Sequence, residues 1–469
     1  MRIFINKAFK FINHRIPILI QTPRARTFGN CAEEIFFGLL KARRQTKKIL
    51  FLYSPNLFSK RMVANENLLL IVDDFCFQNK AVSFLGGLII ASLLIIVRVS
   101  SPLLRLIGSQ NAERLLGSNF REGALFSFYY SSPRVGRSTL WKNEGTSCFS
   151  WETVKELNWA RQYQDYIPPR LNDTDLRKAE QLRTQMGIPI SDWFVCLHVR
   201  EGGYHNDFSS QETRNASIQS YAEGINAINA AGGWVVRIGD STMTPLPKTD
   251  RVIDYPHTKF KSALMDIYLI SQCRFYVGTN SGPADVAALF KKPSILVNAS
   301  DWGNCFSVRM GDLFIPKHVF SRLLNRYLSI EEMLEETHLS PGYRLVPDDC
   351  VMVENTPQEI RDVIEEYLTG PDNFNYSNLQ KVFNEARHSQ LHRMLNQNDN
   401  FSTIGKYRFA SRADAAAGTL GQKYLEKNWS YDNLQLELDL HTEADSKEQS
   451  GIEVSKYNSE SYHLNSQLE

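Results

Sequence analysis

The chain has 469 residues, more than one hydrophobic core usually supports, so we expect two domains with extensions. Hydrophobic residues make up 43% and charged residues 22%, which is the composition of an ordinary globular protein. The seven cysteines are odd in number and never form a Cys-x-x-Cys pair, which argues against a disulfide framework or a zinc site and favours reduced thiols in the cytoplasm.

The net charge of +2 conceals an uneven distribution along the chain. Residues 1–60 hold twelve Lys and Arg against two acidic residues, whereas residues 431–469 hold nine acidic residues against two Lys. A basic N-terminal end indicates an anionic surface nearby. We favour a membrane surface over nucleic acid, because neither zinc-finger spacing nor an aromatic RNA-binding signature accompanies the charge. We therefore predict a cytoplasmic protein that is peripheral on the inner face of the plasma membrane.

The N-terminal part of the chain reads as a β-α-β unit. Residues 1–15 mix bulky apolar and basic residues without a signal-peptide core, and either an interfacial amphipathic helix or an ordinary surface helix fits them. A buried strand over 16–20, a helix over 32–44 and a strand over 48–53 follow. This alternation predicts a parallel sheet covered by helices.

Residues 81–97 form an apolar segment of seventeen residues without a charge, bounded by Lys80 and Arg98. Such a length is at the short limit of a membrane span. A true span would place the N-terminal β-α-β unit and the rest of the chain on opposite sides of the bilayer. We therefore favour a buried or membrane-dipping helical hairpin, divided near Gly86, with the span as the alternative.

The clearest fold signal is a doubly wound α/β domain from about 188 to 370. Strands and helices alternate here, with strands expected at 194–199, 234–238, 251–255, 275–277 and 294–297, and helices at 218–231, 261–272 and 283–290. Residues 371–435 are predicted to be a helical extension. The acidic tail over 436–469, rich in Ser, Asn and Glu, is typical of disorder.

Small and charged residues follow the strand that ends near 199. Arg200 comes directly after the strand, and Gly202 and Gly203 would let a ligand approach the backbone. Arginine offers a fixed bidentate fork to phosphate oxygens and stays charged when desolvated. His198 alternates inward with Arg200, so it either orients a ligand or is a satisfied core histidine.

A second polar turn, Thr279-Asn280-Ser281-Gly282, lies between a predicted strand and a helix that begins near Pro283. Unpaired backbone N–H groups and the positive end of a helix form an anion site. Ligands of open α/β sheets lie at the carboxyl ends of strands, where this turn sits. A capped turn without a ligand is the alternative.

A third strand end at the same predicted edge of the sheet carries Gly239 and Asp240. Its polar tip is placed to meet a nucleoside, although turn formation alone would also account for it.

Together these motifs resemble the nucleotide-binding domain of GT-B glycosyltransferases, over about a quarter of the chain. His198-Val-Arg200 followed by glycines is similar to the fucosyltransferase motif, whose arginine holds the donor diphosphate. Thr279-Asn-Ser-Gly-Pro with Lys292-Pro293 resembles the heptosyltransferase pattern. A group of uncharacterised bacterial glycosyltransferases shares both. Heptosyltransferases usually carry an aspartate where this chain has Asn280, which argues against heptose as the sugar.

The resemblance implies two Rossmann-like doubly wound domains facing a cleft, with residues 1–170 as the acceptor side and 188–370 as the nucleotide-sugar side. It implies transfer of a hexosyl, fucosyl or heptosyl group to a lipid-linked or cell-surface polysaccharide acceptor of a bacterial envelope. No metal and no cofactor beyond the nucleotide-sugar co-substrate are expected, with Arg200 also acting in catalysis by neutralising the leaving diphosphate.

The base that deprotonates the acceptor is expected from the N-terminal half, where Glu33 and Glu34 are the candidates. Either carboxylate could instead be a partner of the helix dipole. Two alternatives to a glycosyltransferase stay open. The first is a nucleotide-binding module without catalysis. The second is another Rossmann-type transferase, although the Gly-x-Gly-x-x-Gly turn typical of many such enzymes is absent after the first strand.

Overall fold

The computed structural model describes residues 18–52, 64–76, 165–205, 212–300, 310–334, 349–370, 375–396 and 418–430, apart from 22 and 24–26, together with residues 85, 86, 88, 89 and 92. The predicted N-terminal helix over 1–15, most of the apolar segment 81–97 and the acidic tail 436–469 lie outside these residues. The five described residues of the apolar segment are helical, and Leu85 and Ile89 are exposed.

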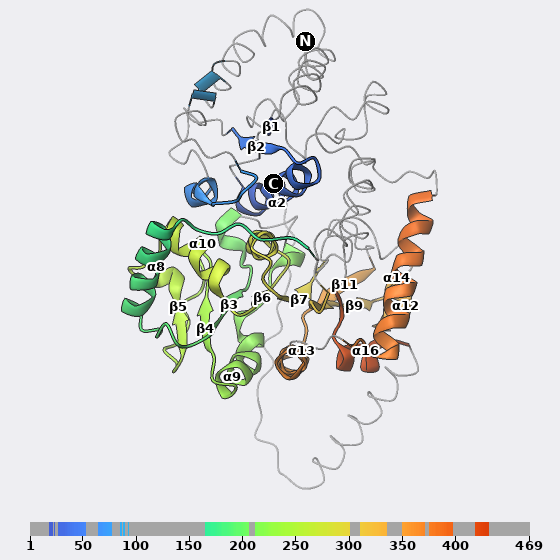
Figure 1. Ribbon diagram of the computed structural model, residues 1–469. Coiled ribbons are helices and arrows are strands. Elements are labelled where there is room, and N and C mark those ends of the chain that lie inside the picture. The colour runs from blue at the N-terminus through green and yellow to red at the C-terminus, as the bar shows by residue number, and fades with distance from the viewer. Residues whose placement is uncertain are drawn as a thin grey trace, which may run out of the picture.

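A seven-stranded parallel sheet forms the centre of the molecule (Figure 1). Its strand order is β12-β8-β7-β6-β3-β4-β5, and every neighbouring pair runs parallel. The strands are β3 (Phe194–His198), β4 (Trp234–Arg237), β5 (Val252–Asp254), β6 (Tyr276–Gly278), β7 (Ser294–Ala299), β8 (Leu313–Pro316) and β12 (Thr419–Leu420). The mixed α/β class and the five predicted strands are therefore confirmed, with ends shifted by a residue or two.

Helices cover both faces of this sheet, as the doubly wound pattern predicts (Figure 1). One face carries α9 (Ala222–Ala230) and α13 (Pro357–Thr369), with α16 (Gln422–Asn428) packed against α13. The other face carries α10 (Ala263–Gln272) and α11 (Gly282–Leu289), and α8 (Asp173–Gln185) packs against α10. A last helix, α14 (Asn378–Asn396), lies beside α16 and β12.

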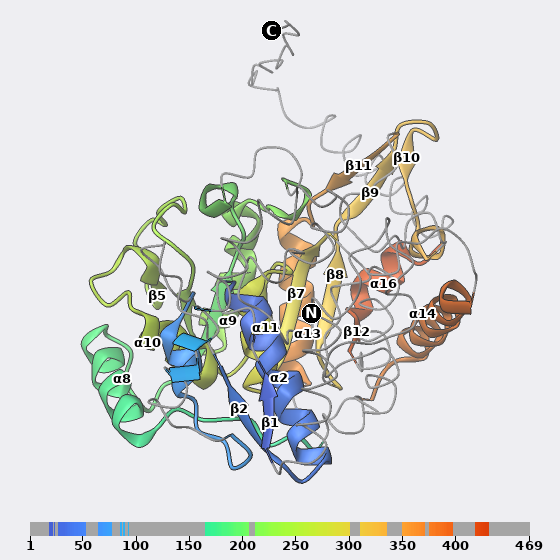
Figure 2. The same cartoon turned by 90° about the horizontal axis from the view of Figure 1, so that it is seen from above.

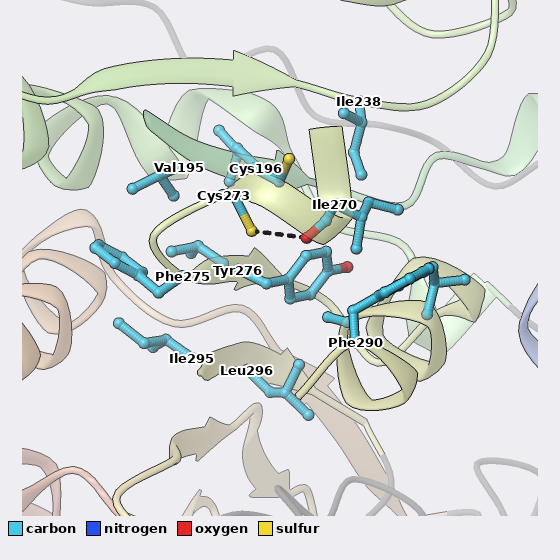
Figure 3. Packing of buried hydrophobic residues seen from close by; sticks show 14 of the residues in the cluster. Val195, Cys196, Ile238, Ile270, Cys273, Phe275, Tyr276, Phe290, Ile295 and Leu296 are labelled. Carbon is cyan, nitrogen blue, oxygen red and sulfur yellow. Dashed lines mark hydrogen bonds between the residues drawn. The ribbon is translucent and has the colours of Figure 1, made fainter. Parts of the chain in front are cut away.

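Figure 3 shows how the sheet packs against its helices. Val195 and Cys196 of β3, Tyr276 of β6 and Ile295 of β7 are all fully buried. Cys196 and Tyr276 point to the side of the sheet where Ile270 of the helical layer lies, whereas Val195 and Ile295 point to the other side. Strands covered on both faces become continuous apolar runs, which is why the sequence signal was clear in this part of the chain.

The N-terminal β-α-β unit is confirmed. Strands β1 (Ile18–Gln21) and β2 (Lys48–Phe51) pair in parallel, and α2 (Phe28–Arg44) connects them. The helix begins at Phe28 rather than at 32, because the Cys31 N–H donates to the Thr27 carbonyl at 2.9 Å and closes an additional first turn.

Two features of the C-terminal part differ from the predictions. Strands that were not predicted follow β7: they are β8 of the main sheet and an antiparallel sheet of β9 (His318–Ser321), β10 (Arg326–Tyr327) and β11 (Cys350–Val353). The predicted helical extension over 371–435 also supplies β12, which pairs with β8 at the edge of the main sheet. A two-residue strand is too short to leave a periodic sequence signal, and its tertiary partner defines it.

Candidate functional site

The two motifs that the sequence analysis singled out meet at the carboxyl edge of the sheet. The Arg200 N–H donates to the Thr279 hydroxyl at 3.2 Å, and the Thr279 N–H donates to the His198 carbonyl at 3.0 Å. His198 lies opposite Gly278 in the register of β3 and β6. A Cβ at Gly278 would stand 2.3 Å from the His198 carbonyl oxygen, so only glycine permits this approach. Residues 79 apart in sequence thus form one continuous edge.

Three cationic side chains from three segments gather at this edge. Arg200, which is 6% exposed, donates to the Asn215 side-chain oxygen. Lys317, 5% exposed, donates from Nζ to the Asn215 backbone carbonyl at 2.6 Å. Arg214 donates from Nη2 to the Asn280 carbonyl at 2.7 Å. We call these three residues the cationic cluster.

The sequence analysis missed Lys317 and Arg214. Lys317 is the first residue after β8 and Arg200 the second after β3, so both lie just beyond the carboxyl end of a strand. The rule that ligands lie at carboxyl ends of strands would have identified it, had β8 been predicted. Arg214 lies in a short 3-10 turn over Glu212–Arg214, which has no sequence signature.

Lys317 is a desolvated ammonium group. Burial lowers its pKa, and the nearby Glu354 carboxylate opposes that shift. Glu354 accepts hydrogen bonds from the Ser217 N–H at 2.9 and 3.1 Å and from the Ser220 hydroxyl at 3.2 Å. Within the described part of the chain, Lys317 forms no ion pair. A buried cation of this kind is favoured when an anion binds beside it.

His198 is a buried, neutral imidazole. Burial lowers its pKa to about 3; the Asp240 carboxylate opposes this, and the Arg237 and Arg200 cations add to it. An imidazole with so low a pKa is a poor proton acceptor at neutral pH, so His198 is unsuited to act as a general base in the ligand-free protein. Because its pKa is lower in the folded chain than in the unfolded one, His198 destabilises the fold as the pH falls from about 6.5 towards 3.

The 279–282 turn leads directly into α11. Ser281 is the N-cap in an extended conformation, makes no side-chain capping bond, and is followed by proline in the first helical turn. The Ala284 N–H donates to the Ser281 carbonyl at 2.9 Å. The Asn280 side chain accepts from the Ser300 N–H at 3.4 Å, which ties the turn to the end of β7. The positive end of α11 therefore lies beside the cationic cluster.

The remaining predicted donor-binding residues lie on adjoining loops. The Asp240 carboxylate accepts from the Thr242 N–H at 2.9 Å and from its hydroxyl at 2.5 Å. Gly203 packs against Thr242, whose hydroxyl would stand 2.6 Å from a Cβ at position 203. Gly239 has φ +154°, a conformation that favours glycine. Gly202 opens the 3-10 turn over Gly202–His205. These contacts fix the loops, and their role in donor binding stays a prediction.

A buried ion network supports the same loops. Arg237 is fully buried and donates to the Glu201 carboxylate at 2.5 Å and to Asp254 at 3.3 Å. Glu201 also accepts from the Thr244 N–H at 2.8 Å. Glu201 immediately follows Arg200, so this network holds the backbone of the first motif in place.

Glu33 and Glu34, the predicted bases, both lie within α2 and are buried. Because α2 begins at Phe28, the two carboxylates sit in its second turn rather than at its start. The backbone carbonyl of Glu34 accepts from the Gln21 side chain at 3.0 Å. Their role as acceptor-side bases stays a prediction.

The N-terminal ends of α2 and α11 touch. A Cβ at Gly29 would stand 2.4 Å from the Gly282 Cα and 2.5 Å from an Asp285 carboxylate oxygen. Because neither glycine has a side chain, the two helix starts can lie in direct contact. Through this contact, the β1-α2-β2 unit packs against the turn of the candidate site.

The described residues contain neither a metal-binding cluster nor a membrane-spanning helix. No group of three or more His, Cys, Asp or Glu side chains in this part of the chain is arranged to hold a metal ion. Among the same residues, no helix has both the length and the apolar character needed to cross a membrane.

No protein-family model and no curated protein matches the chain. Among solved structures, it is similar to a glycosyl transferase family 9 protein from Veillonella parvula DSM 2008, at 11% identity over 60% of this chain and 79% of that chain, with a TM-score of 0.33. It is also similar to NodZ α-1,6-fucosyltransferase soaked with GDP-fucose, at 11% identity, 58% and 92% coverage and a TM-score of 0.27. UDP-GlcNAc 2-epimerase from Methanocaldococcus jannaschii matches at 10% identity, 63% and 65% coverage and a TM-score of 0.20. With TM-scores of 0.33 or lower, these likenesses carry no weight for the fold or the activity of this chain.

Proposed function

We propose that the chain is a glycosyltransferase that uses a nucleotide-sugar donor, whose diphosphate binds at the cationic cluster. The observation that carries this proposal is the convergence of Arg200, Arg214 and Lys317 beside the 279–282 turn. Two of these cations are almost fully buried, and a bound polyanion would offset the cost of desolvating them.

The same arrangement suits the chemistry of glycosyl transfer. When the bond between sugar and diphosphate breaks, negative charge develops on the leaving phosphate oxygen. Fixed cations and the helix start of α11 stabilise that charge without reorganisation, which is where electrostatic help has most effect. Arg200 and Arg214 supply bidentate forks, and Lys317 supplies a point charge. The proposed transfer is metal-independent because these three side chains provide the positive charge.

The acceptor is proposed to be a lipid-linked or cell-surface polysaccharide that approaches from the β1-α2-β2 side. The contact between Gly29 and Gly282 supports this, because it places the start of α2 beside the turn of the donor site. The basic charge of residues 1–60 supports a location on the inner face of the plasma membrane. Glu33 or Glu34 remains the proposed base.

A nucleotide-binding module without catalysis is the second candidate. The burial of both Glu33 and Glu34 favours it, since a base must reach the acceptor hydroxyl. Replacing both residues by glutamine separates the two candidates: loss of transfer with donor binding retained supports the enzyme, whereas no transfer by the wild-type chain with any donor supports the binding module.

The donor site is tested by titrating a panel of nucleoside diphosphates against the protein and following the melting temperature. A diphosphate that binds only the folded state raises it. We expect Arg200→Ala to weaken that binding about 10- to 100-fold, the loss of one charge-assisted contact, and to abolish sugar transfer.

Arg361→Ala is the matched control, because Arg361 is an exposed arginine on α13 that pairs with Glu365 at 2.8 Å. It should bind the diphosphate as the wild type does. An Arg200→Ala protein that keeps both wild-type affinity and turnover would overturn the assignment of Arg200.

A further inference from the structure

We propose that the tip of the β9–β10 hairpin is a contact site for a lipid surface. The tip is the sequence Arg322-Leu323-Leu324-Asn325, and all four residues are exposed. Leu323 is 82% and Leu324 50% exposed, and they are adjacent in the chain. Scattered single leucines on a surface are common, but two neighbouring ones at a projecting tip call for an explanation.

Hydrogen bonds fix the turn at the tip in a conformation that leaves both leucines exposed. The Leu324 N–H donates to the Ser321 hydroxyl at 3.2 Å, and that hydroxyl donates to the Asp349 carboxylate at 3.1 Å. The Arg322 N–H donates to the Asp349 carbonyl at 2.8 Å. Asn325 has φ +51°, a conformation that asparagine tolerates better than most residues. The exposed leucines are thus presented in a fixed geometry, which lowers the entropy lost when they become buried.

An apolar row lies behind the tip. Tyr327 and Val351 flank Phe320 in the strand register, so the three side chains share one face of the small sheet, and all three are half-buried. The Phe320 and Tyr327 rings meet edge to face, with centroids 5.4 Å apart. A leucine tip followed by an amphipathic tyrosine matches the polarity gradient from the acyl region to the headgroups of a bilayer.

A lipid surface fits this tip better than a protein partner does. A stable protein interface takes about 20–30 residues a side, whereas this surface offers two leucines and a row of three side chains. Leucine is also under-represented among the residues that dominate protein interfaces. Arg326 pairs with Glu332 at 2.7 Å, so Arg322 is the cation at the tip whose charge faces solvent. The attraction is therefore expected to be mainly apolar rather than electrostatic.

The hairpin also connects the tip to the candidate site. Strand β9 follows immediately after Lys317 of the cationic cluster. Leu323 comes six residues after Lys317, and six extended residues span at most about 20 Å. Figure 2 shows β9 and β10 projecting beyond the main sheet. If the proposed function holds, contact through this tip would set the donor site close to a membrane-bound acceptor. Lipid contact itself does not depend on that function.

The test is flotation of the full-length protein with neutral phosphatidylcholine vesicles, which exclude attraction by the basic N-terminal end. We expect the double variant Leu323→Asp/Leu324→Asp to lower the partition into vesicles at least about tenfold, because each buried leucine side chain contributes to partition in proportion to its area. The double variant Leu323→Met/Leu324→Met keeps apolar tips and should partition as the wild type does.

Ile190→Asp is the matched control, since Ile190 is 52% exposed but precedes β3, at the opposite edge of the sheet from the carboxyl ends. It should leave partition unchanged. Melting temperatures of all variants, with and without a nucleoside diphosphate, report separately on folding and on the donor site. Equal flotation of the wild type and the double Asp variant would overturn the proposal. So would a wild-type dimer that the double Asp substitution dissociates, because the tip would then bind a second copy.

Discussion

Lys317 and Arg200 are cations that the fold keeps almost entirely out of water. Removing a charge from water is costly unless a partner compensates it, so buried cations at the edge of the sheet are candidates for a function. Each of them donates to an oxygen of Asn215, so one residue orders two cations before any ligand binds. Preorganised cations need no rearrangement when charge develops beside them.

The Lys317→Met variant tests whether the charge of Lys317 serves ligand binding or the stability of the fold. Since burial lowers the Lys317 pKa, the charged group costs folding free energy at neutral pH, and we expect the variant to be at least as stable as the wild type. Its affinity for the diphosphate should fall about 10- to 100-fold, the effect of one charge-assisted hydrogen bond. Thermal melts and calorimetric titrations of both proteins measure the two effects.

The same experiment has a pH signature. A lysine whose pKa is lower in the folded state destabilises the fold below that pKa, and this cost disappears as the pH rises past the unfolded value of about 10.4. The wild type should therefore gain stability relative to Lys317→Met at alkaline pH, while its diphosphate affinity falls as Lys317 loses its proton. A variant that is much less stable than the wild type at neutral pH would make Lys317 a structural residue.

At the scale of elements, the contact between α2 and α11 determines how the N-terminal unit meets the candidate site. Helices normally pack 8–10 Å apart, separated by their side chains. Here the first turns touch through Gly29 and Gly282, with Asp285 beside them. Both helix starts point their positive ends into one small region, and the Asp285 carboxylate lies where it can offset some of that charge.

Gly29→Ala should disturb this contact. The added Cβ would stand 2.4 Å from a backbone atom, so one helix must move, and we expect a loss of about 1–3 kcal/mol in the free energy of unfolding. Because α11 carries the 279–282 turn, diphosphate affinity should fall as well. Chemical denaturation and titration provide both quantities.

Gly370→Ala is the control for that change, since a Cβ at Gly370 would meet its nearest neighbour at an ordinary 3.7 Å. The Gly370→Ala variant should have nearly the same free energy of unfolding and the same diphosphate affinity as the wild type. A Gly29→Ala protein with wild-type stability would show that the two helices are free to separate.

For the whole molecule, the C-terminal residues 418–430 are part of the central α/β sheet domain and not a separate extension. Strand β12 closes one edge of the main sheet, and α16 buries Tyr424 and Leu425. The Tyr424 hydroxyl donates to the Pro316 carbonyl at 3.1 Å, one residue before Lys317. Residues 418–430 therefore contact the main sheet, and the domain boundary at 370 stays a prediction that truncation can test.

A chain that ends after Ser430 keeps all of these contacts, and we expect it to retain the melting temperature and diphosphate binding of the full chain. A chain that ends after Gly370 leaves β8 as the sheet edge and uncovers the apolar surface that α16 buries. It should be insoluble or lose cooperative melting. If the chain that ends after Gly370 melts cooperatively at the temperature of the full chain, the domain boundary at 370 is supported.

The central strands could be read from the sequence because they are buried on both faces. Phe194-Val-Cys-Leu-His198 and Ser294-Ile-Leu-Val297 are nearly continuous apolar runs with helices between them, and that pattern is local. Arg200 and Thr279 could be placed at one edge for the same reason, since parallel strands present their carboxyl ends together. The edge strands β12 and β10 have two residues each, too few for any period.

The sequence by itself therefore determined the α/β class, the parallel central strands and the two motifs that end on a common edge, because those features follow from local periodicity and chain order. Only the tertiary structure could place Arg214 and Lys317 beside Arg200, bury Glu33 and Glu34, and join Gly29 to Gly282. Each of these depends on contacts between segments far apart in the chain, and a distance through space leaves no period in the sequence.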